Sequence, residues 1–227
     1  MVAALENPRR ETPRSILATP ERARQIEAAF PAQARRISLS DNAAIAQRLP
    51  AGAVHQGVAM DIPPLEPLDL DELAADPSGV LLMLDQVTDP QNVGAIFRSA
   101  AAFGARGLIL QSRNSPGFSG ALAKAAAGGL DRLPHAEVVN LSRALERLAD
   151  LGWRAVGLDG SARDSLENVL DGSPTVIVLG SEGEGLRRLV AEHCDALAHI
   201  PMPGGFESLN VSNAAAIALY EAARPRE

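Results

Sequence analysis

The sequence predicts an α/β protein whose main domain is built on a parallel sheet. From residue 79 onwards, short apolar runs alternate with stretches of helical character, and this alternation is typical of parallel α/β folds. The runs are continuously apolar, as expected for strands buried on both faces. A proline-rich acidic segment precedes them and is interpreted as a linker. We therefore expect a small α/β module at 1–60, a linker at 61–78 and the main domain at 79–227.

The same patterns predict the individual elements in chain order. In the first module we expect helices at 2–6, 20–29 and 40–49, and strands at 15–18 and 58–60. In the main domain the predicted strands are 80–84, 107–110, 154–158, 175–179 and, more weakly, 196–200; the predicted helices are 93–103, 117–127, 141–151, 186–193 and 214–223. Ligands of such sheets bind beyond the carboxyl ends of the strands. The loops after Leu84, Leu179 and Ile200 are therefore the candidate binding loops.

Composition excludes several classes of protein. The polar start carries no signal-peptide pattern, and no apolar run approaches the roughly 20 residues that span a bilayer. The single cysteine, Cys194, excludes an intramolecular disulfide and a cysteine-based zinc site. We therefore predict a cytoplasmic protein without a membrane segment or a metal.

The charge is unevenly distributed along the chain. The net charge is −7, but residues 1–50 hold eight arginines against five acidic residues, which gives +3 there and leaves −10 for the rest. Phosphate contacts need cations. The basic front module is thus compatible with RNA binding although the whole chain is acidic.

The loop after the first main-domain strand combines a helix start with polar residues. Asp89-Pro90 signals the start of a helix. Asn92 and Gly94 then fall in the first turn, where free backbone N–H groups can meet an anion. Arg98 follows among apolar neighbours, and a buried arginine needs a partner. We predict that Arg98 contacts a phosphate or a carboxylate of the site and does not face solvent.

The loop at 180–186 is rich in glycine and lies between a strand and a helix. Its spacing matches neither a Walker loop nor the dinucleotide fingerprint. Glu182 would repel a phosphate, so the loop favours a ligand with a positive centre and ribose hydroxyls. S-adenosylmethionine, which has a sulfonium cation and no phosphate, fits that description.

The segment Ile200–Asn213 places prolines, glycines and Ser/Asn side chains directly before a helical run. Serine and asparagine are good helix N-caps, and we expect Ser212 or Asn213 to cap this helix. The remaining irregularity exceeds what a helix entry needs. It predicts a loop that holds a polar ligand.

Three blocks resemble motifs 1, 2 and 3 of the SpoU (TrmH-like) RNA ribose 2′-O-methyltransferases, in order, over residues 79–224. They are the segment from Asn92 to Ala100, the segment from Gly180 to Leu186, and Ile200-Pro-Met together with Ser208-Leu-Asn-Val-Ser. The resemblance implies a SPOUT-type sheet with a C-terminal trefoil knot, homodimerisation, and S-adenosylmethionine as the methyl donor. It implies catalytic or RNA-handling roles for Asn92, Arg98, Glu182, Ser208 and Asn210, and cofactor contacts at Gly180, Ile200, Met202, Gly204 and Leu209.

The front module is similar to the L30e-like substrate-binding domain of the subgroup that methylates a guanosine of 23S rRNA, chiefly through Gly52-Ala-Val-His-Gln-Gly57. Members of that subgroup begin with a strand and a further helix, which would precede Val2, so the module is expected to be truncated at its start. Two alternatives stay open. One is a tRNA ribose methyltransferase, and the other is a catalytically silent RNA-binding ribosome-assembly factor with the same fold.

Overall fold

The computed structural model describes residues 1–113, 116–204 and 209–224. The chain divides into two compact units, Met1–Glu66 and Pro67–Glu227. Each unit is described by itself.

The N-terminal unit is a three-stranded sheet covered by short helices. Strand β1 lies in the centre, parallel to β2 and antiparallel to β3. Ile16 and Ala18 of β1 pack against Ala23 and Ile26 of α2 and form the buried centre of this unit. The elements are α1 (Val2–Glu6), β1 (Ser15–Ala18), α2 (Pro20–Ala29), the 3₁₀ helix η1 (Pro31–Arg36), β2 (Ile37–Leu39), α3 (Asn42–Gln47) and β3 (Val58–Asp61).

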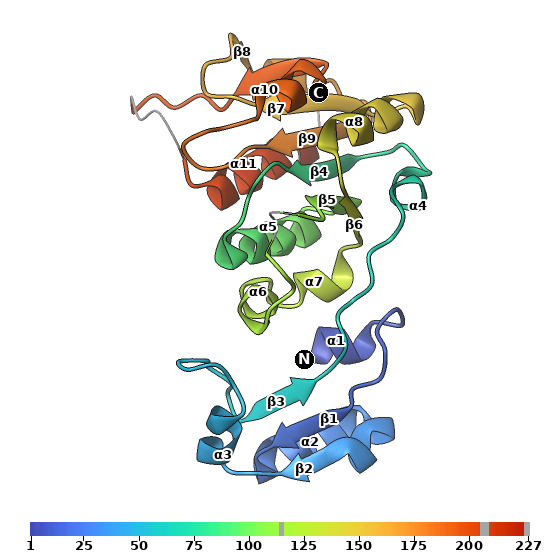
Figure 1. Ribbon diagram of the computed structural model, residues 1–227, viewed down its shortest axis with the longest axis vertical. Helices are drawn as coiled ribbons and strands as arrows, with labels where there is room; N and C mark the ends of the chain where they lie inside the picture. Colours follow the sequence, from blue (N-terminus) through green and yellow to red (C-terminus); the bar gives the residue numbers. More distant parts are fainter. Residues whose placement is uncertain (114–115, 205–208, 225–227) are drawn as a thin grey trace. The chain divides into compact units, whose positions relative to one another are not determined.

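The C-terminal unit is built on a seven-stranded sheet in the order β6-β5-β4-β9-β7-β10-β8, and all its registered strand pairs are parallel (Figure 1). Parallel pairing places the carboxyl ends of all these strands at one edge. The strands are β4 (Val80–Leu84), β5 (Gly107–Gln111), β6 (His135–Val138), β7 (Arg154–Leu158), β8 (Asp164–Ser165), β9 (Thr175–Leu179) and β10 (Ala196–His199).

Helices cover both faces of this sheet. Alternate residues of β4 enter different cores: Leu82 and Leu84 pack with α5, α6, α7, α9 and α11, whereas Leu81 and Met83 pack with α4, α8 and α10. Helices α5 and α11 lie side by side on the first face (Figure 1). The helices are α4 (Leu70–Ala74), α5 (Pro90–Ala102), α6 (Gly120–Ala125), α7 (Gly129–Arg132), α8 (Leu141–Asp150), α9 (Leu166–Val169), α10 (Arg188–Glu192) and α11 (Val211–Ala223).

The predicted parallel α/β fold is confirmed, and the predicted bounds of β4, β7 and β9 agree with the structure. The prediction missed the two strands at the edges of the sheet, β6 and β8. It also placed a linker at 61–78, where the structure has α4 with Leu73 and Ala74 buried. In the described part of the chain, none of the helices has the length and apolar character needed to cross a membrane.

Candidate active site

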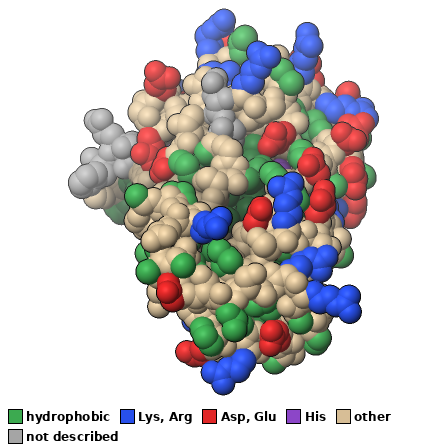
Figure 2. Space-filling model, turned by 60° about the horizontal axis from the view of Figure 1, so that its bottom comes forward, with side chains coloured by type: hydrophobic (Ala, Val, Ile, Leu, Met, Phe, Trp, Pro, Cys, Tyr) green, Lys and Arg blue, Asp and Glu red, His purple; other side chains and the backbone are tan. Residues whose placement is uncertain are grey.

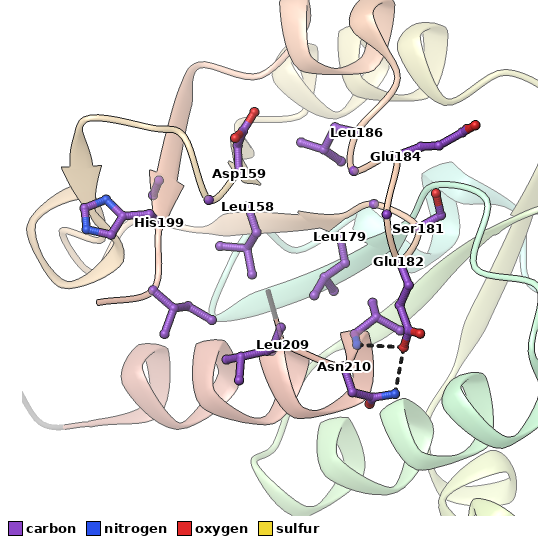
Figure 3. Close-up of a pocket in the computed structure, with 18 of the residues that line it drawn as sticks. Leu158, Asp159, Leu179, Ser181, Glu182, Glu184, Leu186, His199, Leu209 and Asn210 are labelled. Carbon is purple, nitrogen blue, oxygen red and sulfur yellow. Dashed lines mark hydrogen bonds between the residues drawn. The ribbon is translucent and has the colours of Figure 1, made fainter. Parts of the chain in front are cut away.

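A cavity of about 510 Å³ opens at the carboxyl ends of β7, β9 and β10 (Figure 3). Three segments line it: residues 158–160 after β7, residues 179–186 after β9, and residues from 198 to 214 around β10 and the start of α11. Leu158, Leu179 and Leu209 project into the space between these segments (Figure 3). The cavity thus lies where the fold concentrates its strand-end loops.

The glycine-rich loop folds back on itself at the rim. Ser181 and Gly185 exchange backbone hydrogen bonds, with nitrogen-to-oxygen distances of 3.2 and 3.0 Å. The backbones at the two ends of the loop are so close that a Cβ atom on Gly180 would lie 2.1 Å from the carbonyl carbon of Gly185. Glycine is therefore required at position 180 by close approach of the backbone.

Asn92, Glu182 and Asn210, predicted from separate sequence blocks, form one hydrogen-bonded cluster. The Nδ2 of Asn210 donates to Oε1 of Glu182 at 2.7 Å and lies 2.9 Å from Oδ1 of Asn92. The Nδ2 of Asn92 donates to the same Glu182 oxygen at 3.2 Å, as does the backbone N–H of Val211 at 3.2 Å. Figure 3 shows the Glu182 carboxylate above the first turn of α11. One carboxylate oxygen thus ties together the first turns of α5 and α11.

Asn210 also caps α11. Its Oδ1 accepts from the backbone N–H groups of Ser212 at 3.0 Å and Asn213 at 3.4 Å. The prediction that Ser212 or Asn213 is the cap is therefore wrong. An asparagine can serve both purposes because its amide has an acceptor and a donor on opposite sides. The Asp89-Pro90 start of α5 is confirmed, since Asp89 accepts from the backbone N–H of Asn92 at 3.3 Å.

The predicted burial of Arg98 is wrong, whereas its contact with a phosphate stays a prediction. Arg98 is exposed on α5, and its side chain forms no hydrogen bond or ion pair with the described residues. The buried face of α5 is made by other positions, such as Val93 and Phe97, so the apolar neighbours of Arg98 in sequence do not enclose it. Gly94 is buried where an added Cβ would lie 2.6 Å from the Leu122 carbonyl oxygen of α6. Glycine is therefore required at this position by the close packing of α5 on α6.

The cavity is acidic at its polar edge. Asp159, Glu182 and Glu184 line it, and no lysine or arginine is among the described residues that do. His199 also lines it, and its Nδ1 is buried with no hydrogen-bond partner among the described residues. Apolar walls with several carboxylates suit an organic cation better than a phosphorylated ligand.

The predicted cofactor residues mostly meet at this cavity. Gly180, Ile200, Met202 and Leu209 line it, whereas Gly204 is not among the lining residues. Ser208 lies outside the described residues. Within the described ranges, no group of His, Cys, Asp or Glu side chains is arranged to hold a metal ion.

One side of the cavity was not predicted from the sequence. Leu158, Asp159 and Gly160 form the loop after β7 and line the cavity. The sequence did contain a signal for this loop, namely the predicted strand at 154–158 followed by Asp-Gly. Since all parallel strands end at the same edge of the sheet, the loop after this strand was also a candidate binding loop. His199 was also missed, and nothing in its sequence context distinguishes it.

The model of the SpoU rRNA Methylase family matches residues 79–220, which contain the cavity and the cluster. An uncharacterised tRNA/rRNA methyltransferase from Mycolicibacterium vanbaalenii is 42% identical over 184 residues. That alignment includes 79% of this chain and 59% of the relative, so this chain matches little more than half of the longer protein.

Two solved structures show the same fold. The SpoU methyltransferase AviRb from Streptomyces viridochromogenes, solved in complex with AdoMet, matches with a TM-score of 0.82 at 25% identity, over 98% of this chain and 85% of that one. An RNA 2′-O ribose methyltransferase matches with a TM-score of 0.77 at 25% identity, over 97% of this chain and 83% of that one. Because the family model spans more than half of its residues, this chain belongs to the SpoU rRNA methylase family.

Proposed function

We propose that this protein transfers a methyl group from S-adenosylmethionine to a ribose 2′-hydroxyl of RNA, and that its substrate is a guanosine of 23S rRNA. The observation that carries the proposal is the cluster of Asn92, Glu182 and Asn210 at the rim of an acidic, apolar-walled cavity. The AviRb structure, solved with AdoMet as its cofactor, supports the choice of donor.

The residues of the cavity fit S-adenosylmethionine. The cavity volume of about 510 Å³ lies within the range of small-molecule sites. The carboxylates of Asp159, Glu182 and Glu184 favour a ligand with positive charge, and the leucine walls suit a flat heterocycle. Gly180, its neighbours Leu179 and Ser181, and Ile200 line the cavity, and their backbone N–H and C=O groups are candidate partners for the cofactor.

When bound, S-adenosylmethionine supplies a methyl group that its sulfonium centre has already activated. The chain therefore needs to orient the ribose and manage the proton of its hydroxyl. Asn92 and Asn210 both donate hydrogen bonds to Glu182, which orients their amide groups, so they are suited to fixing the position of the ribose. The role that the resemblance gives to Ser208 remains a prediction.

Arg98 is assigned to the RNA. A guanidinium group stays protonated in proteins, so it is a poor general base. An exposed arginine with no partner among the described residues is available to bind a substrate phosphate and to stabilise the developing alkoxide. We expect Arg98→Ala to lower methyl transfer by at least about tenfold while the Kd for S-adenosylmethionine stays unchanged. The control is Arg143→Ala, an exposed arginine on α8, the helix that packs on the other face of the sheet.

A second copy of the chain is proposed to cover an apolar face formed by α5 and α11. Phe103 and Tyr220 are exposed there and stack edge to face, with ring centroids 6.2 Å apart. Ile217 of α11 is exposed as well. Large exposed apolar side chains gathered in one place are typical of interaction surfaces. The same two helices carry the cluster at their N-terminal ends, whereas Phe103 and Tyr220 lie near their C-terminal ends.

The knot and the L30e-like module are also proposed from the family. The knot is supported by the fold match to AviRb. For the N-terminal unit, the support is the excess of eight arginines over five acidic residues in residues 1–50, and a structural match that extends over 98% of the chain. On the face drawn in Figure 2, basic side chains alternate with acidic ones and do not form one large patch.

Two experiments test the proposal. Calorimetry with S-adenosylmethionine separates an enzyme from a silent assembly factor, because the enzyme binds the cofactor and the factor does not. Mapping 2′-O-methyl groups in a strain that lacks the gene then identifies the RNA. Loss of one methyl group in 23S rRNA supports the proposal, loss in tRNA selects the alternative substrate, and unchanged rRNA and tRNA would refute the activity.

A further inference from the structure

Asp85 is a fully buried carboxylate that the proposed chemistry does not use. It directly follows β4, and its side chain has 0% exposure. A carboxylate in such a place is costly unless charges and hydrogen bonds compensate it. Its position at the carboxyl end of a central strand, next to the end of β9, brings it close to the glycine-rich loop.

The partner of Asp85 is Arg187, which follows that loop. The Nε of Arg187 donates to Oδ1 of Asp85 at 2.6 Å, and the backbone N–H of Arg187 donates to Oδ2 at 2.9 Å. The Nη2 of Arg187 also donates to Oε1 of Gln111, at the end of β5, at 3.3 Å. Both the side chain and the backbone of one residue are therefore fixed to the sheet.

These contacts lie on the opposite side of the loop from the cavity. The strand order places β4 and β5 on one side of β9, whereas the cavity lies towards β7 and β10. Leu186, the residue before Arg187, lines the cavity, and so does the loop that ends there. Asp85 and Gln111 thus hold one end of the loop, and the cluster at Glu182 holds its middle.

We propose that Asp85 and Arg187 are positioning residues that fix the glycine-rich loop in its cofactor-binding conformation, so that affinity for S-adenosylmethionine depends on this ion pair. The inference rests on the proposed function, because it assigns the cavity to that cofactor. Neither Asp85 nor Arg187 is among the residues that line the cavity, so both act through the loop.

The test separates positioning from stability by removing the pair in two ways. Arg187→Met leaves the buried carboxylate without its guanidinium, and both the Tm and the affinity should fall. The double variant Asp85→Leu with Arg187→Met replaces the pair by apolar groups, which often restores stability. We expect its Tm to recover while S-adenosylmethionine binds at least about tenfold more weakly than to the wild type, measured by calorimetry. Recovery of wild-type affinity in the double variant would overturn the inference.

A milder variant keeps the inference testable if the double variant does not fold. Arg187→Lys preserves the charge but cannot reproduce the fork that reaches both Asp85 and Gln111. We expect a raised Kd at an almost unchanged Tm, and an unchanged Kd would count against the proposal. Arg147→Met is the matched control, since Arg147 forms an equally short but exposed pair with Asp71, at 2.7 Å, away from the cavity.

A second readout does not need the cofactor. The amides of Ser181 and Gly185 are hydrogen-bonded within the loop, so their hydrogen exchange reports on its conformation. Faster exchange in the Arg187 variants supports the positioning role, and unchanged exchange contradicts it. If wild-type protein failed to bind S-adenosylmethionine, the proposed function would be refuted, whereas the exchange rates would still decide whether the ion pair fixes the loop.

Discussion

Gly180→Ala tests whether the folded-back loop forms the cofactor site. The added Cβ would lie 2.1 Å from the carbonyl carbon of Gly185, whereas ordinary contact begins near 3.4 Å, so the loop backbone must move by about 1.3 Å. The φ angle of Gly180 lies outside the left-handed region, so alanine adds no backbone strain of its own. The perturbation is therefore a steric displacement of the loop.

The magnitude follows from what overpacking costs. Inserting a methyl group into a filled space costs about 1–3 kcal/mol. If the whole cost falls on the binding-competent loop, the Kd for S-adenosylmethionine rises roughly 5- to 140-fold at about 1.4 kcal/mol per tenfold. Calorimetry measures this change. The matched control is Gly120→Ala at the start of α6, where an added Cβ meets nothing within 4 Å. Wild-type affinity in Gly180→Ala would refute the assignment of this loop to the cofactor.

Three further predictions concern the interface and two titrating side chains. Tyr220→Glu places a charge on the apolar face of α5 and α11, so sedimentation should show the proposed dimer for the wild type and a monomer for the variant; an unchanged mass would exclude this face as the interface. Burial, followed by the nearby Asp195 carboxylate, raises the pKa of Cys194 to about 12, so iodoacetamide at about pH 8 should alkylate the native protein far more slowly than the unfolded chain; equal rates by mass spectrometry would contradict the burial. The Leu189 carbonyl, and then Glu146, raise the pKa of His193 above 6.5. The pKa of His193 is higher in the folded state than in the unfolded state. The stabilisation by His193 is therefore fully present below the unfolded-state pKa and is lost as the pH rises through the folded-state pKa. The Tm deficit of His193→Gln should therefore be larger at about pH 5.5 than at about pH 8.5, and a deficit that grows with pH would contradict this assignment.

The central strands could be predicted from sequence because both of their faces are buried. Val80–Leu84 and Thr175–Leu179 are continuous apolar runs that match β4 and β9. The edge strands carry a weaker signal: β6 mixes His135 and Glu137 with apolar residues, and β8 has only the two residues Asp164 and Ser165. Their pairing depends on the neighbouring strand, which local sequence does not report.

Candidate site residues that lie within recognisable sequence motifs could be predicted. Contacts that depend on how distant segments meet in the fold could not. The resemblance named Asn92, Glu182 and Asn210, and the structure joins them although they lie 28 to 118 residues apart. The pairing of Asp85 with Arg187, 102 residues further along, had no sequence signal. For Arg98, apolar neighbours in sequence suggested burial, but on a helix the neighbours in space are three and four positions away. The exposure of Arg98 becomes evident only once the structure shows which face of α5 packs against the sheet and its neighbouring helices.

The central claim is tested most directly by methyl transfer in vitro. Purified protein would be incubated with S-adenosylmethionine and rRNA from a strain that lacks the gene, and the RNA would be digested to nucleosides for mass spectrometry. We predict one new 2′-O-methylnucleoside that appears with the wild type and forms at least about tenfold more slowly with Arg98→Ala. Methylation of a base instead of a ribose, or no transfer to RNA by protein that binds the cofactor, would contradict the account.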